Sequence, residues 1–245
     1  MSDSERAAKQ ALKFQTGISG ALGKARICHE YDSMGWDELI EAIALLRTYW
    51  HGRDTIDREV ISSLFQVPEW IYWQASNRLT QSKDRNALLA VMTKVRIETV
   101  ALLHDSRLDL RGMSDWRAVA REGGRAPDKR KVRYKKNSKL DKAVRIVCDS
   151  HKKLIQDAAL ESVGRTRGGR EHLVEAVLEL QKAWEGESFL PRYVTALLND
   201  LVEAEFDLVM MEASGTRSQR KGNSSRELVR AVGVLFHAQV GTENK

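Results

Sequence analysis

Residues that interrupt helices or cross-link the chain are scarce in this sequence. Its 245 residues include three prolines, Pro68, Pro127 and Pro191, and two cysteines, Cys28 and Cys148. Because proline is the residue least tolerated inside a helix, its scarcity leaves room for long helices. Two cysteines cannot build a disulfide framework, so a reducing compartment is the simpler interpretation.

Long apolar runs are missing as well. The longest, Leu39 to Leu46, is interrupted by Glu41 and is far shorter than the ~20 residues needed to cross a bilayer. The N-terminus, Met-Ser-Asp-Ser-Glu, lacks the apolar core of a signal peptide. We therefore expect an intracellular protein that touches membranes only peripherally.

Apolar side chains instead recur at spacings of three and four residues, which is typical of helices with one buried face. Ala, Leu, Glu, Lys and Arg dominate these stretches, and they lose little on entering a helix. The fold class that follows is all-α. The predicted apolar stripes run over Trp36–Trp50, Ile56–Phe65, Trp70–Leu79, Leu88–Val100, Leu140–Ile155, Leu173–Trp184, Leu197–Met210 and Leu228–Phe236.

Capping residues indicate where some of these helices begin. Ser33 is placed to cap the helix that contains Trp36, and Asp54 or Thr55 to cap the next one. Pro191 favours the first turn of a later helix, because its missing N–H is not needed there.

A glycine-containing leader precedes the first strong stripe. We expect a helix from about Ser4 to Phe14, followed by Gly17, Gly20 and Gly23. Each glycine weakens a helix, so this segment is predicted to be flexible and to pack loosely.

The domain organisation follows from chain length and from a change in composition. At 245 residues the chain exceeds a typical domain of ~150 residues. We predict an N-terminal helical domain over residues 1–120, a basic linker over 121–137 and a C-terminal helical domain over 138–245. The architecture is then two helical bundle-like units joined by a basic segment.

The basic segment concentrates positive charge far beyond the average of the chain. Residues 117–145 hold twelve cations and three acidic residues, a net charge of +9, whereas the whole chain has +6. Charge gathered in this way suits a polyanionic partner and counterion release. A solvated linker between domains is the alternative. The candidate binding residues here are Arg125, Lys129, Arg130, Lys131, Arg133, Tyr134, Lys135, Lys136 and Lys139, with Tyr134 available to stack on bases.

Two smaller basic groups lie in loops that open helices, where backbone N–H groups also favour anions. Taken singly they read as solvated loops, but together they could extend one basic face. They are Arg165, Arg167 and Arg170, and Arg217, Arg220 and Lys221. The run 129–136 also resembles a nuclear localisation signal.

Signatures of catalysis and of cofactor binding are weak. No phosphate-binding loop with its lysine and no nucleophile motif occurs, so no cofactor and no catalytic residue is predicted. Cys148 and His151 are three residues apart and could supply half of a zinc site, although a buried thiol beside an exposed imidazole is favoured. An enzyme built from unmarked carboxylates stays open as a third alternative.

Aromatic residues crowd into the first half of the chain. Core packing is their expected role, and a groove for a partner helix or for bases is the alternative. Trp70 and Trp73 share a helical face, whereas Tyr72 is predicted to be exposed or at an interface. The set comprises Trp36, Tyr49, Trp50, Trp70, Tyr72 and Trp73.

Two short stretches carry a resemblance to a known family. They are Asp37–Ile43, an acidic-aliphatic helix, and Ala143–Cys148 followed by His151. With the order helical unit, basic segment, smaller helical unit, they resemble the matrix proteins of the influenza-like viruses (orthomyxoviruses). The resemblance implies a virion protein whose basic segment binds ribonucleoprotein and acidic lipid. That family's proposed zinc ligands are Cys-x2-Cys and a later histidine pair; here His151 replaces the second cysteine and no such pair follows.

The function we expect is therefore structural and non-enzymatic. A matrix-like protein would self-assemble as a homo-oligomer and bind RNA, ribonucleoprotein or anionic membrane lipid through the basic segment. The alternative is an RNA-binding nucleoprotein or regulator. The expected location is intracellular and peripheral to a membrane, with a nuclear phase if the 129–136 run acts as a signal, and in the virion if the source is viral.

Overall fold

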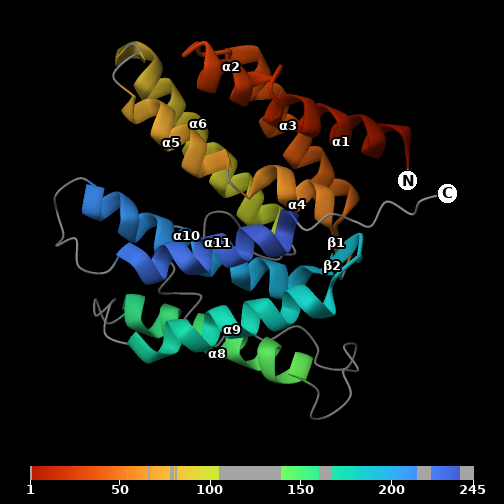
Figure 1. The fold of residues 1–245 in the computed structure, drawn as a ribbon. Coiled ribbons are helices and arrows are strands. Elements are labelled where there is room, and N and C mark those ends of the chain that lie inside the picture. Colours follow the sequence, from red (N-terminus) through yellow and green to blue (C-terminus); the bar gives the residue numbers. More distant parts are fainter. Residues whose placement is uncertain are drawn as a thin grey trace. The chain divides into compact units, whose positions relative to one another are not determined.

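A computed structural model describes residues 2–53, 55–65, 67–77, 80, 82–104, 139–159, 167–213 and 222–237. The chain divides into unit 1, residues 1–106 with 188–192, and unit 2, residues 107–187 with 193–245. The predicted domain limits near 120 and 138 fall outside the described residues. Within the described ranges the two three-residue strands are the only β-structure, which confirms the all-α prediction (Figure 1).

Unit 1 is a bundle of helices with a two-stranded sheet at one side. α1 packs against α3 and α4, α3 against α6, and α5 against α2 and α6. The predicted stripe of α3 is confirmed, since Trp36, Leu39, Ile43 and Leu46 are all fully buried. The helices are α1 (Asp3–Thr16), α2 (Ala21–Ile27), α3 (Ser33–Tyr49), α4 (Arg58–Leu64), α5 (Val67–Ser76) and α6 (Ser82–Leu103).

The segment between α3 and α4 differs from the prediction. Ile56 was assigned to a helix, but it lies in β1 (Thr55–Asp57), which pairs antiparallel with β2 (Phe189–Pro191). Asp57, instead of Asp54 or Thr55, caps α4 by accepting the Glu59 N–H at 2.9 Å. Pairing with a segment so distant in sequence overrides the local helical pattern.

The helix predicted over Ser4–Phe14 is confirmed by α1, but the flexible glycine segment after it was predicted wrongly. It contains the short helix α2, and its glycines are tightly packed. A Cβ added at Gly20 would meet the backbone of Phe14 and Gln15, and one at Gly23 would meet the Ile18 carbonyl. Glycine is needed here because backbone approaches backbone, not because the chain is loose.

Two local predictions around α3 and α5 need correction. Asp32, and not Ser33, caps α3 by accepting the Gly35 N–H at 3.0 Å. On α5 the exposed aromatic side chain is Trp73, whereas Tyr72 is half-buried and meets the Trp73 ring edge-on. Three-residue spacing fixed which residues share a face but not which face meets the bundle.

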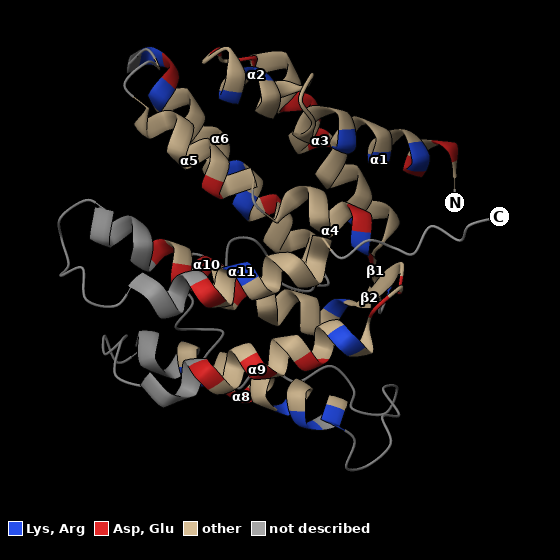
Figure 2. Cartoon of the chain, in the orientation of Figure 1, with Lys and Arg blue, Asp and Glu red and all other residues tan. Residues whose placement is uncertain are grey.

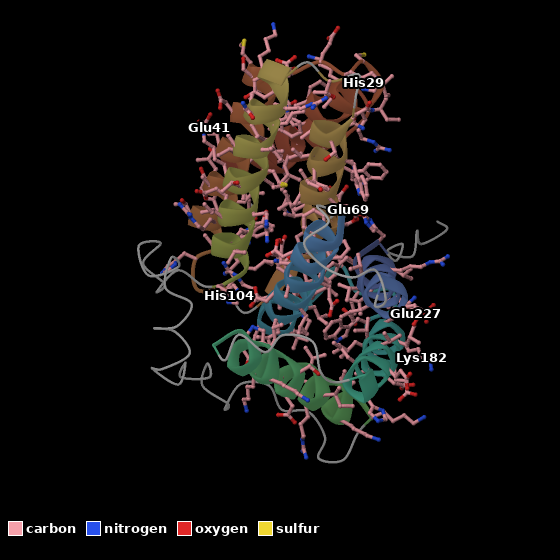
Figure 3. The ribbon with its side chains drawn as sticks, turned by 90° about the vertical axis from the view of Figure 1, so that its left-hand side faces the viewer. His29, Glu41, Glu69, His104, Lys182 and Glu227 are labelled. Carbon is pink, nitrogen blue, oxygen red and sulfur yellow. The ribbon has the colours of Figure 1, made fainter. Side chains whose placement is uncertain are left out.

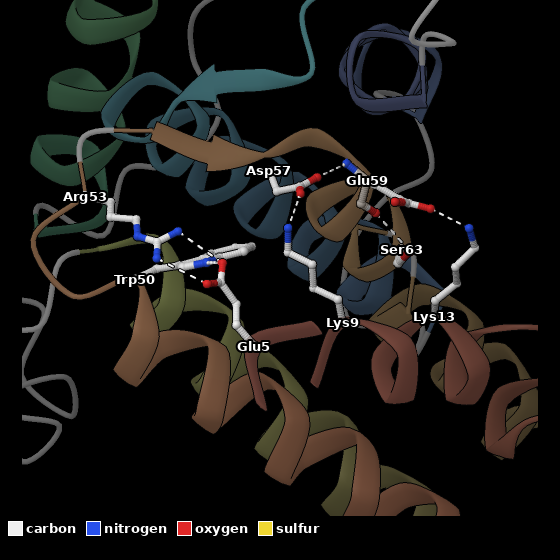
Figure 4. A network of polar contacts seen from close by, with 8 residues as sticks. All are labelled: Glu5, Lys9, Lys13, Trp50, Arg53, Asp57, Glu59 and Ser63. Atoms are coloured by element: carbon white, nitrogen blue, oxygen red, sulfur yellow. Dashed lines mark hydrogen bonds and ion pairs between the residues drawn. The ribbon is translucent and has the colours of Figure 1, made fainter. Parts of the chain in front are cut away.

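Three charged side chains of α1, spaced four residues apart, hold it against the end of α3, β1 and α4 (Figure 4). The buried Glu5 carboxylate accepts a 2.7 Å hydrogen bond from Trp50 Nε1. Lys9 pairs with Asp57 at 2.5 Å. In the same row, Lys13 pairs with Glu59 at 2.5 Å, on the exposed surface.

Arg192 closes unit 1 from the far end of the sequence. Its side chain is buried and donates to backbone carbonyls, at 2.6 Å from Nη1 to Trp50 O and 3.0 Å from Nε to Leu102 O. Leu103 O and Arg53 O accept further bonds from it. The carbonyls at the ends of α3 and α6, which have no partner within their helices, are thus satisfied by one guanidinium.

The described part of unit 2 contains four helices, of which α10 has its first residue, Arg192, in unit 1. They are α8 (Lys139–Ala159), α9 (Arg167–Ala183), α10 (Arg192–Ala213) and α11 (Gly222–His237). α9 packs against both α8 and α11. Pro191 was predicted to open a helix, but it ends β2 and α10 begins one residue later. Leu180, Val232, Leu235 and Phe236 form part of a fully buried core.

Candidate functional site

Most of the predicted binding residues lie outside the described residues. This holds for Arg125, Lys129, Arg130, Lys131, Arg133, Tyr134, Lys135 and Lys136, and for Arg165, Arg217, Arg220 and Lys221. Arg167 and Arg170 belong to the first turn of α9, and their side chains lie outside the described part of the structure. Lys139 is the candidate whose side chain is described, and it is exposed as the first residue of α8.

The end of the basic segment that is described becomes the outer face of α8. Ala143 and Val147 are buried on the inner side of this helix. Lys142, just before Ala143, and Arg145, midway between Ala143 and Val147, are exposed. Since residues three and four apart share a helical face, apolar and cationic residues separate onto opposite sides.

The cationic face continues beyond the segment that the sequence singled out. Lys152 and Lys153 are exposed two turns after Arg145. Asp149, which lies between Arg145 and Lys152, is an exposed acidic residue. We define the α8 face as the five exposed cations Lys139, Lys142, Arg145, Lys152 and Lys153; α8 is coloured by charge in Figure 2. The basic segment identified from charge, residues 117–145, ends at Arg145 and leaves out the last two lysines. Their helical spacing from Arg145 could have indicated that they share its face.

The neighbouring helix α9 carries the opposite charge on its outer side. Glu171 and Glu175 are exposed, and Glu179 pairs with Lys182 at 3.0 Å. The hydrogen bond from Lys182 holds the pKa of Glu179 below its usual value, with a smaller contribution from Lys139 of α8. Positive charge is therefore a property of the α8 side and not of the whole described surface of unit 2.

The two units differ in overall charge. Unit 1 contains fourteen Lys and Arg and fourteen Asp and Glu, so its formal charge is balanced. Unit 2 contains 26 Lys and Arg against 20 Asp and Glu, and so accounts for the entire net charge of +6. On formal charge, a polyanion would therefore be attracted by unit 2 and not by unit 1.

Cys148 and His151, the two candidate zinc ligands, have other partners in unit 2. His151 Nε2 lies 2.8 Å from Oδ2 of the buried Asp200, and Cys148 shares a hydrogen bond with Tyr193. The described residues hold no group of three or more His, Cys, Asp or Glu placed to bind a metal ion. Nothing in the described part completes a site around this pair.

The same group does not have the electrostatics of an activated nucleophile. Burial raises the pKa of the Cys148 thiol, and burial with the nearby thiol raises the pKa of Tyr193 to about 12. Catalytic thiols need the opposite shift, because the thiolate is the reactive form. Cys148 and Tyr193 therefore act here as a hydrogen-bonded structural pair.

Comparison of the chain with protein-family models, with curated proteins and with solved structures found no match in any of the three. Among the described helices, none combines the length and the apolar character needed to span a bilayer.

Proposed function

We propose that the protein is a non-enzymatic, matrix-like structural protein that self-assembles and binds an anionic membrane surface or ribonucleoprotein. The contact is made by the central basic segment together with the α8 face. The observation that carries this proposal is the exposure of five cations along one side of α8. Three of them, Lys139, Lys142 and Arg145, belong to the +9 segment, and Lys152 and Lys153 extend it.

Three further observations support the proposal. The net positive charge belongs to unit 2, so the attraction is directional. An exposed row of Lys and Arg attracts acidic headgroups with about 1 kcal/mol for each residue near the surface. Self-assembly would place many such rows side by side, and the resulting avidity would make weak contacts effective.

The test removes three cations of the α8 face. The variant Lys142→Ala, Arg145→Ala, Lys152→Ala is compared with a control that removes one arginine and two lysines exposed in unit 1, Arg6→Ala, Lys83→Ala, Lys94→Ala. Both variants lose the same charge and the same residue types.

Binding is measured by co-sedimentation with vesicles containing phosphatidylserine and, separately, by titration with single-stranded RNA at several salt concentrations. We expect the α8 variant to bind vesicles about 100-fold more weakly, because three cations each contribute about 1 kcal/mol. The control should lose far less. Equal losses in the two variants would show a net-charge effect without a site and would contradict the proposal.

The RNA titration separates the proposed function from its alternative. The alternative is supported if the wild-type protein does not bind vesicles and the α8 variant binds RNA more weakly, with a flatter salt dependence than wild type. The protein is then an RNA-binding nucleoprotein or regulator. Vesicle binding accompanied by ordered assembly supports the matrix-like function.

A further inference from the structure

The four most exposed large apolar side chains in the described part of the chain all lie between residues 14 and 34. They are Ile18 at 79% exposure, Met34 at 77%, Ile27 at 63% and Phe14 at 55%. Single exposed apolar residues are ordinary on protein surfaces. Their concentration around the seven-residue helix α2 is not, and the core packing of unit 1 does not use these side chains.

Tight packing holds this group at one end of unit 1. Gly23 allows α2 to lie against the preceding turn, and Lys24 of α2 pairs with Asp32, the N-cap of α3, at 2.5 Å. His29, just after α2, lies at the opposite end of unit 1 from His104, which follows α6 (Figure 3). We call residues 14–34 the α2 corner.

The cations of the corner lie on α2, ahead of two acidic residues. Residues 14–34 contain Lys24 and Arg26 against Glu30 and Asp32, so the formal charge of the corner is balanced. Both cations are exposed on α2. The Arg26 guanidinium lies 3.8 Å from the centre of the Trp70 ring. Exposed aliphatic residues beside cations and tryptophan are the groups that settle at a membrane interface.

We propose that the α2 corner inserts into the surface of an anionic bilayer. Ile18, Ile27 and Met34 enter the boundary between headgroups and acyl chains, and Lys24 and Arg26 contact lipid phosphates. Ile18 stands in a turn between Gly17 and Gly20 and projects outward. A fluid bilayer accommodates a projecting apolar side chain, whereas a protein partner would need a cavity of matching shape.

This inference rests on the proposed membrane association and adds a second contact to it. The α8 face attracts the acidic surface from a distance, and the α2 corner contributes apolar burial. Stable peripheral attachment generally needs two such signals, because one electrostatic or one short apolar contact is reversible.

Cys28 offers a reporter at the corner itself. Its side chain is exposed directly after Ile27, whereas Cys148 is half-buried. In a Cys148→Ser background, which keeps a hydrogen-bond partner for Tyr193, an environment-sensitive fluorophore is attached to Cys28. On phosphatidylserine–phosphatidylcholine vesicles its emission should shift to the blue, and lipids brominated near the headgroup should quench it.

Two matched variants test whether the apolar side chains cause the insertion. Ile18→Ser with Ile27→Ser should weaken vesicle binding about tenfold and abolish the blue shift, since burying even part of an aliphatic side chain is strongly favourable. Ile97→Ser, at a 42% exposed position of α6, should change neither. A double variant that binds and shifts like wild type would overturn the inference.

An experiment with tethered protein distinguishes a failure of this inference from a failure of the proposed function. A C-terminal hexahistidine tag holds the full chain on vesicles with nickel-chelating lipid, whether or not the α8 face binds. A blue shift in the tethered protein, without binding to vesicles that lack the nickel-chelating lipid, supports the corner and contradicts the α8 proposal. No shift in the tethered protein contradicts the corner alone. If the double variant instead alters only sedimentation behaviour in the absence of lipid, the corner is a contact between copies and the inference is wrong.

Discussion

At the residue scale, buried charges in unit 1 are used to satisfy the backbone and one another. Glu5 is the best example, because its carboxylate accepts from the Trp50 indole at 2.7 Å and from Arg53 at 3.1 Å (Figure 4). The Lys9 ammonium also lies 5.2 Å from the centre of the Trp50 ring. A buried carboxylate without such donors would carry a desolvation cost of several kcal/mol.

The Glu5 contacts predict a pH-dependent contribution to stability. The hydrogen bond from Trp50 and, after it, the Arg53 pair lower the pKa of Glu5 despite its burial. A lowered folded-state pKa means that the contribution is present above the unfolded value of about 4.5 and is lost as the pH falls through the folded value. Glu5→Gln should therefore lower the free energy of unfolding by about 1.5–3 kcal/mol at pH 7 and by less near pH 3.

Urea unfolding followed by circular dichroism at the two pH values checks this. Glu41→Gln, at an exposed position of α3, serves as the control and should have little effect at either pH. An equal loss at pH 7 and pH 3 would show that packing, and not the charge of Glu5, makes the contribution.

At the element scale, α2 is held by close contacts with α1, with the turn before it and with α3, and glycines leave room for these contacts. The amide of Ala21 donates to Gln15 Oε1 at 3.0 Å, so α1 also caps the start of α2. A Cβ at Gly35 of α3 would lie 2.7 Å from the same oxygen. A helix this short has little stability of its own, and these contacts supply it.

Gly23→Ala tests this packing with a change that normally favours a helix. Alanine in place of a helical glycine usually stabilises by up to about 1 kcal/mol. Here the new Cβ would meet the Ile18 carbonyl, and we expect a loss of about 1–3 kcal/mol. Asn86→Ala at an exposed position of α6 should be neutral or slightly stabilising. A Gly23→Ala protein with a higher denaturation midpoint would show that α2 does not pack as described.

At the scale of the whole molecule, unit 1 is discontinuous in sequence. Residues 188–192 supply β2 and the buried Arg192, whereas the rest of the unit ends at residue 106. The chain must therefore complete an excursion through α8 and α9 before unit 1 is finished. Closing so long a loop costs entropy, which the Arg192 bonds and the strand pairing offset.

We therefore expect Arg192 to control the stability of unit 1, although most of that unit lies far earlier in the sequence. Arg192→Met should remove several charge-assisted bonds to buried carbonyls and lower the free energy of unfolding by at least about 3 kcal/mol. Arg192→Lys should lose less, because an ammonium can still reach part of the set. Hydrogen exchange should rise at the ends of α3 and α6. Unchanged exchange there would contradict the role assigned to Arg192.

Periodicity was sufficient to predict the helical class and the positions of the longer helices. The stripes over Trp36–Trp50 and Leu88–Val100 were located because burial on one side repeats every three to four residues. The charge count likewise located a basic segment, and its described end is exposed on α8. These properties are local, so the sequence by itself determined them.

Only the tertiary structure decided features that depend on contacts between distant residues. Ile56 became a strand residue because residues 189–191 pair with β1, and Gly20 and Gly23 became packing sites because backbones meet there. The exposure of Ile18, Ile27 and Met34 follows from which face of each element the bundle covers. Spacing along the chain carries no information about that choice, since it is made by segments far away in sequence.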